Sequence, residues 1–350
     1  MKNIFPNFYK KFNCIADACP DSCCKDWDVV VDDESQSFYQ NVDGNFGEKL
    51  KQLTTIDSDG DRIFISQNGR CPFWNDHKLC DIYINLGEEH LCKTCREFPR
   101  ITLDYTAFAE HILSFACPQA AKLMLKSPDD FNCFQSDFSF NENVDYNESL
   151  MNFLINARKA TFEILNDSNK PFSEKLKECL VFNNAVQNQL DNDDYSVDVL
   201  NNFEYSSCKM HNNNCQFILK LHKQLDTMSE KWSDILNQIG KNDTTQNALS
   251  DYDSEFLSFA LYYVLRYYLN AIDSYDVLST IKRIVCAVVV ISKAQDYLKR
   301  KNGTLTFEER TEIFQLYSKE VEHSYENGEL LDEEFLTNSE FSTENLISIL

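Results

Sequence analysis

The sequence predicts a mainly α-helical protein in which an irregular, cysteine-rich N-terminal metal-binding region is followed by a helical bundle. Three observations favour this fold class. The 350 residues include only 8 glycines and 7 prolines, too few for a turn-rich β protein. From Ser149 onward, apolar residues recur at helical spacing. Nine of the 14 cysteines lie within the first 117 residues, where the elements look short and irregular.

The same patterns predict a division of the chain into three parts. We expect a cysteine-rich metal or iron–sulfur region over residues 1–126 and a helical domain over residues 149–350. Residues 127–148 are polar and acidic and have no helical period, which is typical of a linker or surface loop.

Charge and hydropathy exclude several classes of partner. The chain carries 56 acidic and 33 basic residues, for a net charge of −23, and this field repels nucleic acid. The first 14 residues contain no apolar run of the kind a secretory signal needs. The longest apolar run has 8 residues, whereas a membrane-spanning helix takes roughly 20. We therefore expect a cytoplasmic protein that binds neither nucleic acid nor membrane; the sequence indicates no oligomeric state.

Individual elements follow from local pattern. Brief strands are expected at residues 29–31 and 63–65, one or two helical turns within 87–98, and a helix over 118–126 with Pro118 near its first position. Apolar spacing predicts helices over residues 215–239, 256–272 and 277–298. Thr306 and Glu309 form a capping box at the start of another helix, and the acidic tail after Glu326 is expected to fray.

A group of tyrosines in the second of these helices has two interpretations. A cage around a ligand is one, and core packing is the other. Large apolar side chains usually fill the interior, so we expect packing. The residues are Tyr262, Tyr263, Tyr267 and Tyr268.

The N-terminal cysteines form the main chemical signal. In a reducing compartment, cysteines a few residues apart indicate a thiolate-bound metal more than disulfides, and distant pairs complete the shell when the chain folds back. Buried free thiols are the alternative. The nine are Cys14, Cys19, Cys23, Cys24, Cys71, Cys80, Cys92, Cys95 and Cys117.

The spacing leaves the metal open between zinc and an iron–sulfur cluster, because an all-thiolate shell suits both. The nearby His77, His90 and His111 could serve zinc. Cys23 and Cys24 are adjacent and cannot easily bind one ion. Basic side chains among these cysteines would offset the charge of a thiolate centre, or lie on the surface: Lys25, Lys93, Arg96 and Arg100.

Two common S-adenosylmethionine or nucleotide signatures are absent. The radical S-adenosylmethionine motif has three cysteines separated by three and then two residues. After Cys19 and Cys23 its third cysteine would have to stand at Asp26, so the motif is absent. No G-x-G-x-x-G nucleotide-binding motif follows a predicted strand either.

The order of these motifs resembles the flagellin lysine-N-methylase family, which is itself related to zinc- and iron-chelating domains. The likeness covers roughly Phe8 to Leu125, and the rest is similar only in being helical. It is carried by the runs FNC (12–14), CPDSCCKDW (19–27), CPF (71–73), LC (79–80), LGE (86–88), TCREFPR (94–100) and CPQAA (117–121). Gln119 departs from the family, which tends to have glutamate there.

The resemblance implies transfer of methyl groups from S-adenosylmethionine to lysines of flagellin, with a cysteine-bound iron–sulfur cluster, [4Fe–4S] in preference to zinc. It implies that the metal ligands are Cys14, Cys19, Cys23, Cys24, Cys71, Cys80, Cys95 and Cys117, with Cys92 additional. No residue can be assigned to S-adenosylmethionine. The alternative is a non-catalytic zinc- or iron-chelating or redox protein.

Lysine methylation also needs a group that takes up a proton. Candidates within the matched region are carboxylates and tyrosines, each of which could equally be a surface or packing residue. We select Asp32, Glu110 and Tyr83; Glu97 and Tyr105 are the other candidates.

Overall fold

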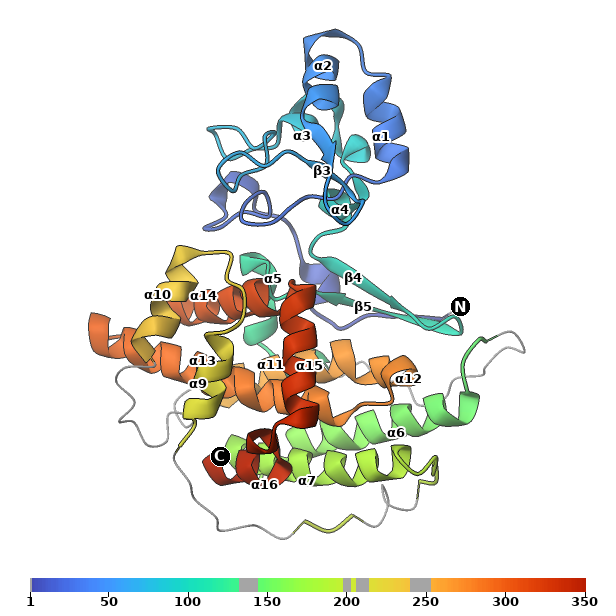
Figure 1. Cartoon of the computed structure of the whole chain (residues 1–350), viewed down its shortest axis with the longest axis vertical. Coiled ribbons are helices and arrows are strands. Elements are labelled where there is room, and N and C mark those ends of the chain that lie inside the picture. Colours follow the sequence, from blue (N-terminus) through green and yellow to red (C-terminus); the bar gives the residue numbers. More distant parts are fainter. Residues whose placement is uncertain (1, 132–143, 198–202, 206–213, 240–252) are drawn as a thin grey trace.

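A computed structural model describes residues 2–131, 144–197, 203–205, 214–239 and 253–350 of the chain (Figure 1). The protein is mainly helical, which confirms the predicted fold class. Its buried apolar side chains form two cores. A small core lies in residues 27–98, which we call the small lobe, and a much larger core gathers the helices together with a short sheet. In Figure 1 the small lobe stands above this helical body.

The sheet joins the N-terminal segment to the helical body. Strand β5 lies in the centre, parallel to β1 and antiparallel to β4, and Ile4 pairs with Glu110. Phe8 and Phe12 follow β1 and are buried in the large core. The elements are β1 Lys2–Ile4, η1 Tyr9–Lys11, β4 Arg100–Asp104 and β5 Phe108–Leu113. The sequence pattern did not predict this sheet.

The small lobe contains short elements around Val29, Val31, Tyr39 and Phe73. The strand expected at residues 29–31 is wrong, because Val30 forms only an isolated bridge with Ile63 while its two neighbours point into the core. The strand expected at 63–65 is present as β3. The elements are α1 Asp33–Gln40, α2 Gly44–Gln52, β2 Thr54–Ile56, β3 Arg62–Phe64, α3 Asp81–Leu86, η3 Glu88–His90 and α4 Lys93–Glu97. The turns η3 and α4 confirm the helical turns expected within 87–98.

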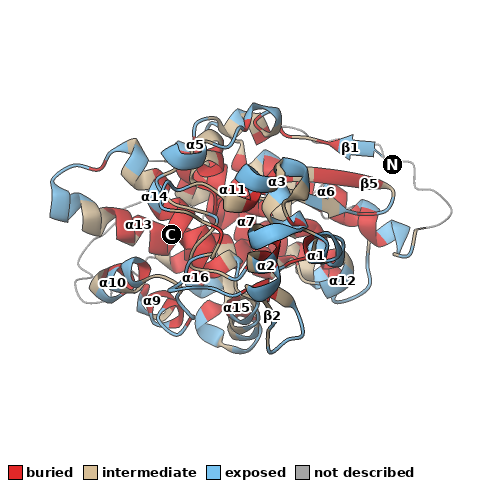
Figure 2. Ribbon diagram, turned by 90° about the horizontal axis from the view of Figure 1, so that it is seen from above, coloured by how far each residue is buried: buried red, intermediate tan, exposed pale blue. Residues whose placement is uncertain are grey.

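Helix α11 lies at the centre of the helical body, where it contacts α5, α6 and α13. Figure 2 shows that the buried residues concentrate in these helices, whereas α1 to α3 are largely exposed. The elements are α5 Pro118–Leu125, η4 Pro128–Phe131, α6 Glu148–Leu165, α7 Phe172–Leu190, α9 Gln216–His222, α10 Glu230–Ile239, α11 Asp253–Tyr267, η6 Tyr268–Asn270, α12 Ala271–Ser274, α13 Leu278–Asn302, α14 Phe307–Tyr317, η7 Ser318–Glu322, α15 Tyr325–Thr337, η8 Ser339–Phe341 and α16 Thr343–Ile349.

Most of the predicted helices are present. Pro118 occupies the first turn of α5, α13 covers the β-branched run, and Thr306 and Glu309 form the expected capping box of α14. The helix expected over 215–239 is instead two, α9 and α10. The break is stabilised from elsewhere in the chain, because the amides of Asp226 and Met228 donate to Asn327 and Glu320.

The tyrosines of α11 and η6 pack in the interior, as expected. Tyr262, Tyr263 and Tyr268 are buried in the large core. Their hydroxyls also serve the interior, since Tyr262 donates to Glu322 and Tyr268 donates to Asn183.

The C-terminal tail is ordered, so the expectation that it frays is wrong. Phe335 of α15, Phe341 of η8 and Leu346 of α16 are buried in the large core, and apolar burial outweighs the acidic composition of this segment.

The expected linker over residues 127–148 falls partly outside the described residues, because 132–143 are not among them. Its first residues form η4, in which Phe131 packs against Phe8. The division into residues 1–126, 127–148 and 149–350 stays a prediction. No helix in the described ranges combines the length and apolar character needed to cross a membrane.

His222 makes the stability of the helical body depend on pH. Its Nδ1 lies 2.9 Å from the carbonyl oxygen of Ile218 and its Nε2 lies 3.1 Å from the hydroxyl of Tyr317, an arrangement that suits a neutral ring. Burial lowers the pKa of His222 from 6.5 to about 4. Between these two values the unfolded chain binds a proton that the folded chain does not, so stability falls as pH falls through this window.

We expect this histidine to account for about 3 kcal/mol of lost stability between pH 6.5 and pH 4. Urea unfolding at pH 7, 6 and 5 measures the effect against His222→Gln, whose free energy of unfolding should vary less steeply with pH. Equal slopes for the two proteins would contradict the assignment.

Candidate functional site

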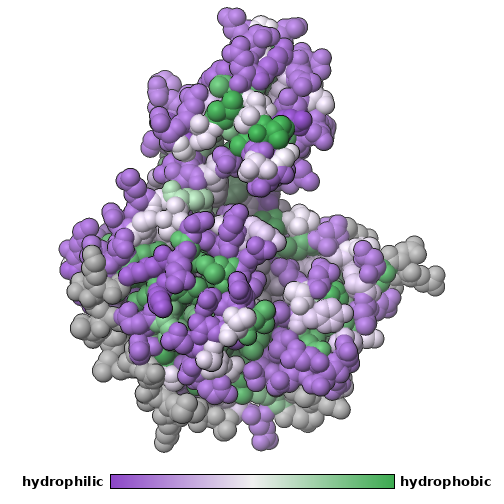
Figure 3. Space-filling view, viewed as in Figure 1, coloured by the Kyte–Doolittle hydropathy of each residue, from purple (hydrophilic) through white to green (hydrophobic). Residues whose placement is uncertain are grey.

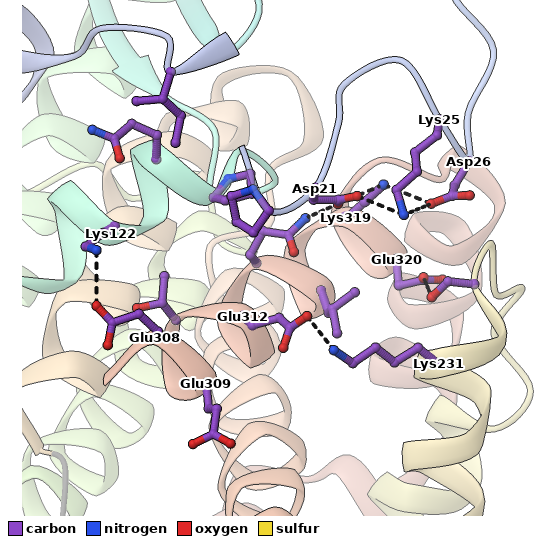
Figure 4. Close-up of a pocket in the computed structure, with 18 of the residues that line it drawn as sticks. Asp21, Lys25, Asp26, Lys122, Lys231, Glu308, Glu309, Glu312, Lys319 and Glu320 are labelled. Carbon is purple, nitrogen blue, oxygen red and sulfur yellow. Dashed lines mark hydrogen bonds and ion pairs between the residues drawn. The ribbon is translucent and has the colours of Figure 1, made fainter. Parts of the chain in front are cut away.

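A pocket of about 450 Å³ opens where residues 14–26, which we call the cysteine loop, meet the helical body (Figure 4). The loop forms one wall, and α5, α10, α14 and η7 form the others. The lining includes a small apolar part: Ile15, Ala18, Pro20, Pro118 and Leu316. Most of the rest is charged: Asp21, Lys25, Asp26, Lys122, Lys231, Glu308, Glu309, Glu312, Lys319 and Glu320.

Lys319 ties the cysteine loop to the helical body. Its ammonium lies 3.1 Å from Asp21 Oδ2 and 3.1 Å from Asp26 Oδ2, and its side chain is 2% exposed. The ammonium also lies 5.2 Å from the centre of the Trp27 ring. Burial alone would raise the pKa of Asp21, but Lys319 and Lys25 hold it below its usual value. Asp21 therefore stays charged, and the contacts of Lys319 with both carboxylates fix the loop against η7.

Gln315 makes a second connection from α14. Its Nε2 donates to Asp21 Oδ2 at 3.1 Å and to the carbonyl of Ala116 at 3.0 Å. Ala116 directly precedes Cys117, the residue before α5. One amide thus holds together the two segments that carry the first and last cysteines of the N-terminal set.

Glu320 follows Lys319 in η7, a π-helical turn, and is buried at the edge of the pocket. One of its oxygens accepts from the amide of Met228 at 2.6 Å and the other from the hydroxyl of Ser229. Burial raises the pKa of this carboxyl, although the hydrogen bonds from Ser229 and Met228 act in the opposite direction. π-Helical turns occur often at functional sites.

The cysteine loop brings Cys19 and Cys23 near Cys117. Burial raises the pKa of Cys117 to about 12, and the charges of Cys19 and Cys23 add to the rise. The pKa of Cys23 is raised by its hydrogen bond with Cys24 and by burial. These thiols therefore share one neighbourhood, beside the wall of the pocket.

A second group of thiols lies in the small lobe. Burial raises the pKa of Cys71 to about 12, with further contributions from Cys80, Cys92 and Cys23. A hydrogen bond between Cys92 and Cys95 lowers the pKa of Cys92 and raises that of Cys95. Cys23 thus interacts electrostatically with both groups.

These thiols fit a thiolate-bound centre in their chemistry, since all nine are free and they lie close enough to influence one another. However, the thiols are not arranged around one point: across the described ranges, no three His, Cys, Asp or Glu side chains are grouped so that they could hold a metal ion. The nearby histidines have other contacts. His111 bonds to Thr102 and Asn3, and His90 stacks on Phe38.

The three residues selected for proton transfer lie on different elements, and in the described part of the chain no hydrogen bond or ion pair joins any two of them. Asp32 caps α1 and accepts from the amides of Ser35 and Lys93. Burial opposes these bonds, which nevertheless lower its pKa to about 2. Glu110 is buried against Arg158, and Tyr83 is exposed on α3.

None of these three lines the pocket, nor do Glu97 and Tyr105. The carboxylates that do line it come from the cysteine loop, α14 and η7. Sequence reasoning missed Lys319 and Glu320, although charged residues directly after the apolar run of α14 were a usable signal. Gln119, the position that departs from the resemblance, is part of the lining.

Comparison with known proteins shows to which family the chain belongs. A family model described as the FliB lysine N-methylase C-terminal domain matches residues 158–349, more than half of the sequence. The chain belongs to the FliB lysine N-methylase family. This membership confirms the resemblance noted from the N-terminal motifs. The match includes α14 and η7, so the family's C-terminal domain supplies half of the pocket wall.

Relatives of this FliB family member occur in Salmonella. A lysine-N-methylase of Salmonella typhimurium is 30% identical over 136 residues, which cover 35% of this chain and 32% of that protein. The flagellar biosynthetic protein FliU of Salmonella muenchen is 29% identical over 136 residues, 35% of this chain and 77% of that protein. The chain thus spans about a third of the length of the lysine-N-methylase it matches. No solved structure matches the chain.

Proposed function

We propose that this protein is an S-adenosylmethionine-dependent methyltransferase that modifies lysine side chains of flagellin. Family membership supports the reaction class, and the names of the relatives, lysine-N-methylase and flagellar biosynthetic protein, support the substrate. The observation that carries the proposal is the acidic pocket between the cysteine loop and the family's C-terminal domain. A cation is the group that such a pocket attracts.

The reaction sets two requirements for the site. The lysine amine must lose its proton before it can attack the methyl carbon of the sulfonium, and the two atoms must be held in line. A pocket lined by both carboxylates and apolar groups can bind the amine and orient its alkyl chain. The proton acceptor stays a prediction, with Asp32, Glu110 and Tyr83 as its candidates.

We also propose that cysteines of the N-terminal part hold a [4Fe–4S] cluster. Its ligands would come from Cys14, Cys19, Cys23, Cys24, Cys71, Cys80, Cys95 and Cys117. Their mutual influence on pKa supports the proposal, because it indicates that these thiols lie near one another, and a bound metal would stabilise them as thiolates. When bound, the cluster would supply redox-active iron beside the pocket. Zinc bound by the same thiols is the second candidate.

Metal analysis and a transfer assay test the two proposals separately. Protein purified without oxygen should contain about four irons and as many sulfides per chain. With S-adenosylmethionine labelled in its methyl group, it should label lysines of flagellin. Cys23→Ser should lose iron, whereas the matched control Cys286→Ala, in the interior of α13, should retain it.

The outcomes separate the alternatives. Zinc without iron would overturn the cluster assignment. Intact metal with no label on lysine would favour a non-catalytic chelating protein, and a reversible redox potential with no cofactor binding would favour an electron carrier.

A further inference from the structure

The charges of the pocket do not cancel. Among the residues that the structure describes, six carboxylates and four ammonium groups line it. The four lysines are all paired: Lys25 and Lys319 with Asp21 and Asp26, Lys122 with Glu308, and Lys231 with Glu312. Two carboxylates remain, Glu309 and Glu320. Figure 4 shows these pairs spread around the pocket.

The two remaining carboxylates differ in their surroundings. Glu309 is a partly exposed member of the capping box of α14, where solvent can screen its charge. Glu320 is 1% exposed, and in the part of the chain that the structure describes it forms no ion pair. Its carboxylate accepts hydrogen bonds from neutral donors, which include the amide of Met228 and the hydroxyl of Ser229. Lys319 acts on Glu320 electrostatically, but it makes its ion pairs with Asp21 and Asp26. A buried carboxylate that no ion pair neutralises is energetically costly, so an incoming cation gains most beside Glu320.

The apolar residues in the lining and the volume of the pocket indicate which kind of cation fits. Ile15, Ala18, Pro20 and Pro118 form an apolar part on the side of the cysteine loop and α5, and Leu316 adds to it from α14. A volume of about 450 Å³ is in the range of ligand pockets and is ample for a lysine side chain. An alkylammonium fits this lining, because its methylenes can contact the apolar groups while its charge meets the carboxylate.

We propose that the pocket receives the lysine side chain of the protein substrate and that Glu320 binds its ammonium. This inference rests on the proposed function and deepens it, by placing the substrate amine between the cysteine loop and η7. The charged pairs around the pocket hold its walls in place, and Glu320 supplies the free negative charge.

A binding assay on the full-length, metal-loaded protein tests the inference without methyl transfer. The probe is a fluorescent ten-residue flagellin peptide with one lysine, compared with the same peptide carrying norleucine. Norleucine keeps the alkyl chain and removes the ammonium. Wild type should bind the lysine peptide at least about tenfold more tightly, since a tenfold preference needs only about 1.4 kcal/mol.

Two variants localise the binding. Glu320→Gln keeps the shape and one acceptor oxygen, and should reduce the preference for lysine to about twofold or less. Ala18→Trp places bulk at an exposed position of the lining and should weaken binding of both peptides. Glu163→Gln removes the same unit of charge from the exposed face of α6 and should behave as wild type. Thermal unfolding confirms that each variant is folded.

Wild-type lysine preference in folded Glu320→Gln, or unchanged peptide binding in Ala18→Trp, would overturn the inference. So would a loss in Glu320→Gln of binding to S-adenosylmethionine, another cation, with binding to the lysine peptide intact. Lysine-selective binding without methyl transfer would sink only the proposed function, and full transfer by Glu320→Gln would sink only the inference.

Discussion

Replacing Lys319 by methionine is expected to lower the free energy of unfolding by about 3–5 kcal/mol. The substitution leaves Asp21 and Asp26 facing a buried methyl group, without the ammonium that now lies 3.1 Å from each. Lys25 still reaches both carboxylates, at 3.0 and 3.5 Å, but from the exposed side of the loop. The cysteine loop should therefore detach from η7 before the helical body unfolds.

Urea unfolding and amide hydrogen exchange of residues 14–26 measure the two effects. Lys122→Met is the matched control, because its pair with Glu308 lies at the same pocket with both side chains exposed, and its loss should hardly change the free energy of unfolding. If both variants lose equally little stability and exchange in the loop is unchanged, the role given to Lys319 is wrong.

Arg158→Met should destabilise the helical body by a similar amount, about 3–5 kcal/mol. Arg158 and Glu110 form two parallel hydrogen bonds of 2.7 and 2.6 Å, with side chains only 1% and 4% exposed. The pair joins α6 to β5. Removing the guanidinium leaves a carboxylate buried in the large core, where neither water nor another cation replaces the lost partner.

The double variant Glu110→Gln/Arg158→Met removes both charges and should be less destabilised than the sum of the two single variants. Arg62→Met is a suitable control, because its partner Asp33 is almost fully exposed. Additive effects of the two core substitutions would contradict a coupled pair. Transfer activity of folded Glu110→Gln would in addition test whether Glu110 takes part in chemistry.

Local signals in the sequence predicted a good part of the helical body. Thr306 with Glu309, Pro118 and the length of the apolar run in α13 each determine structure through neighbours in the chain. The break between α9 and α10 could not be predicted in this way. It depends on Glu320 and Asn327, about 90 to 100 residues further along, which bind the amides that a continuous helix would use.

The same distinction applies to the candidate site. The cysteines stood out by spacing, and the structure places Cys23 close to both groups of thiols. The pocket beside the cysteines could not be recognised in the sequence, because its walls come from segments nearly 300 residues apart. Lys25, four residues along the chain, is a local partner of Asp21, whereas Gln315 and Lys319 reach it only through folding.

The sheet has a consequence for how this family can vary. The chain leaves the sheet region near Phe12 and returns at Arg100, whose guanidinium lies 5.1 Å from the centre of the Phe12 ring. The residues between them, 13–99, form one inserted segment whose two ends lie next to each other. Evolution can therefore lengthen, shorten or exchange this inserted segment while the strands at its base stay paired, as in domain insertions. Chimaeras that swap it between relatives should keep a folded base.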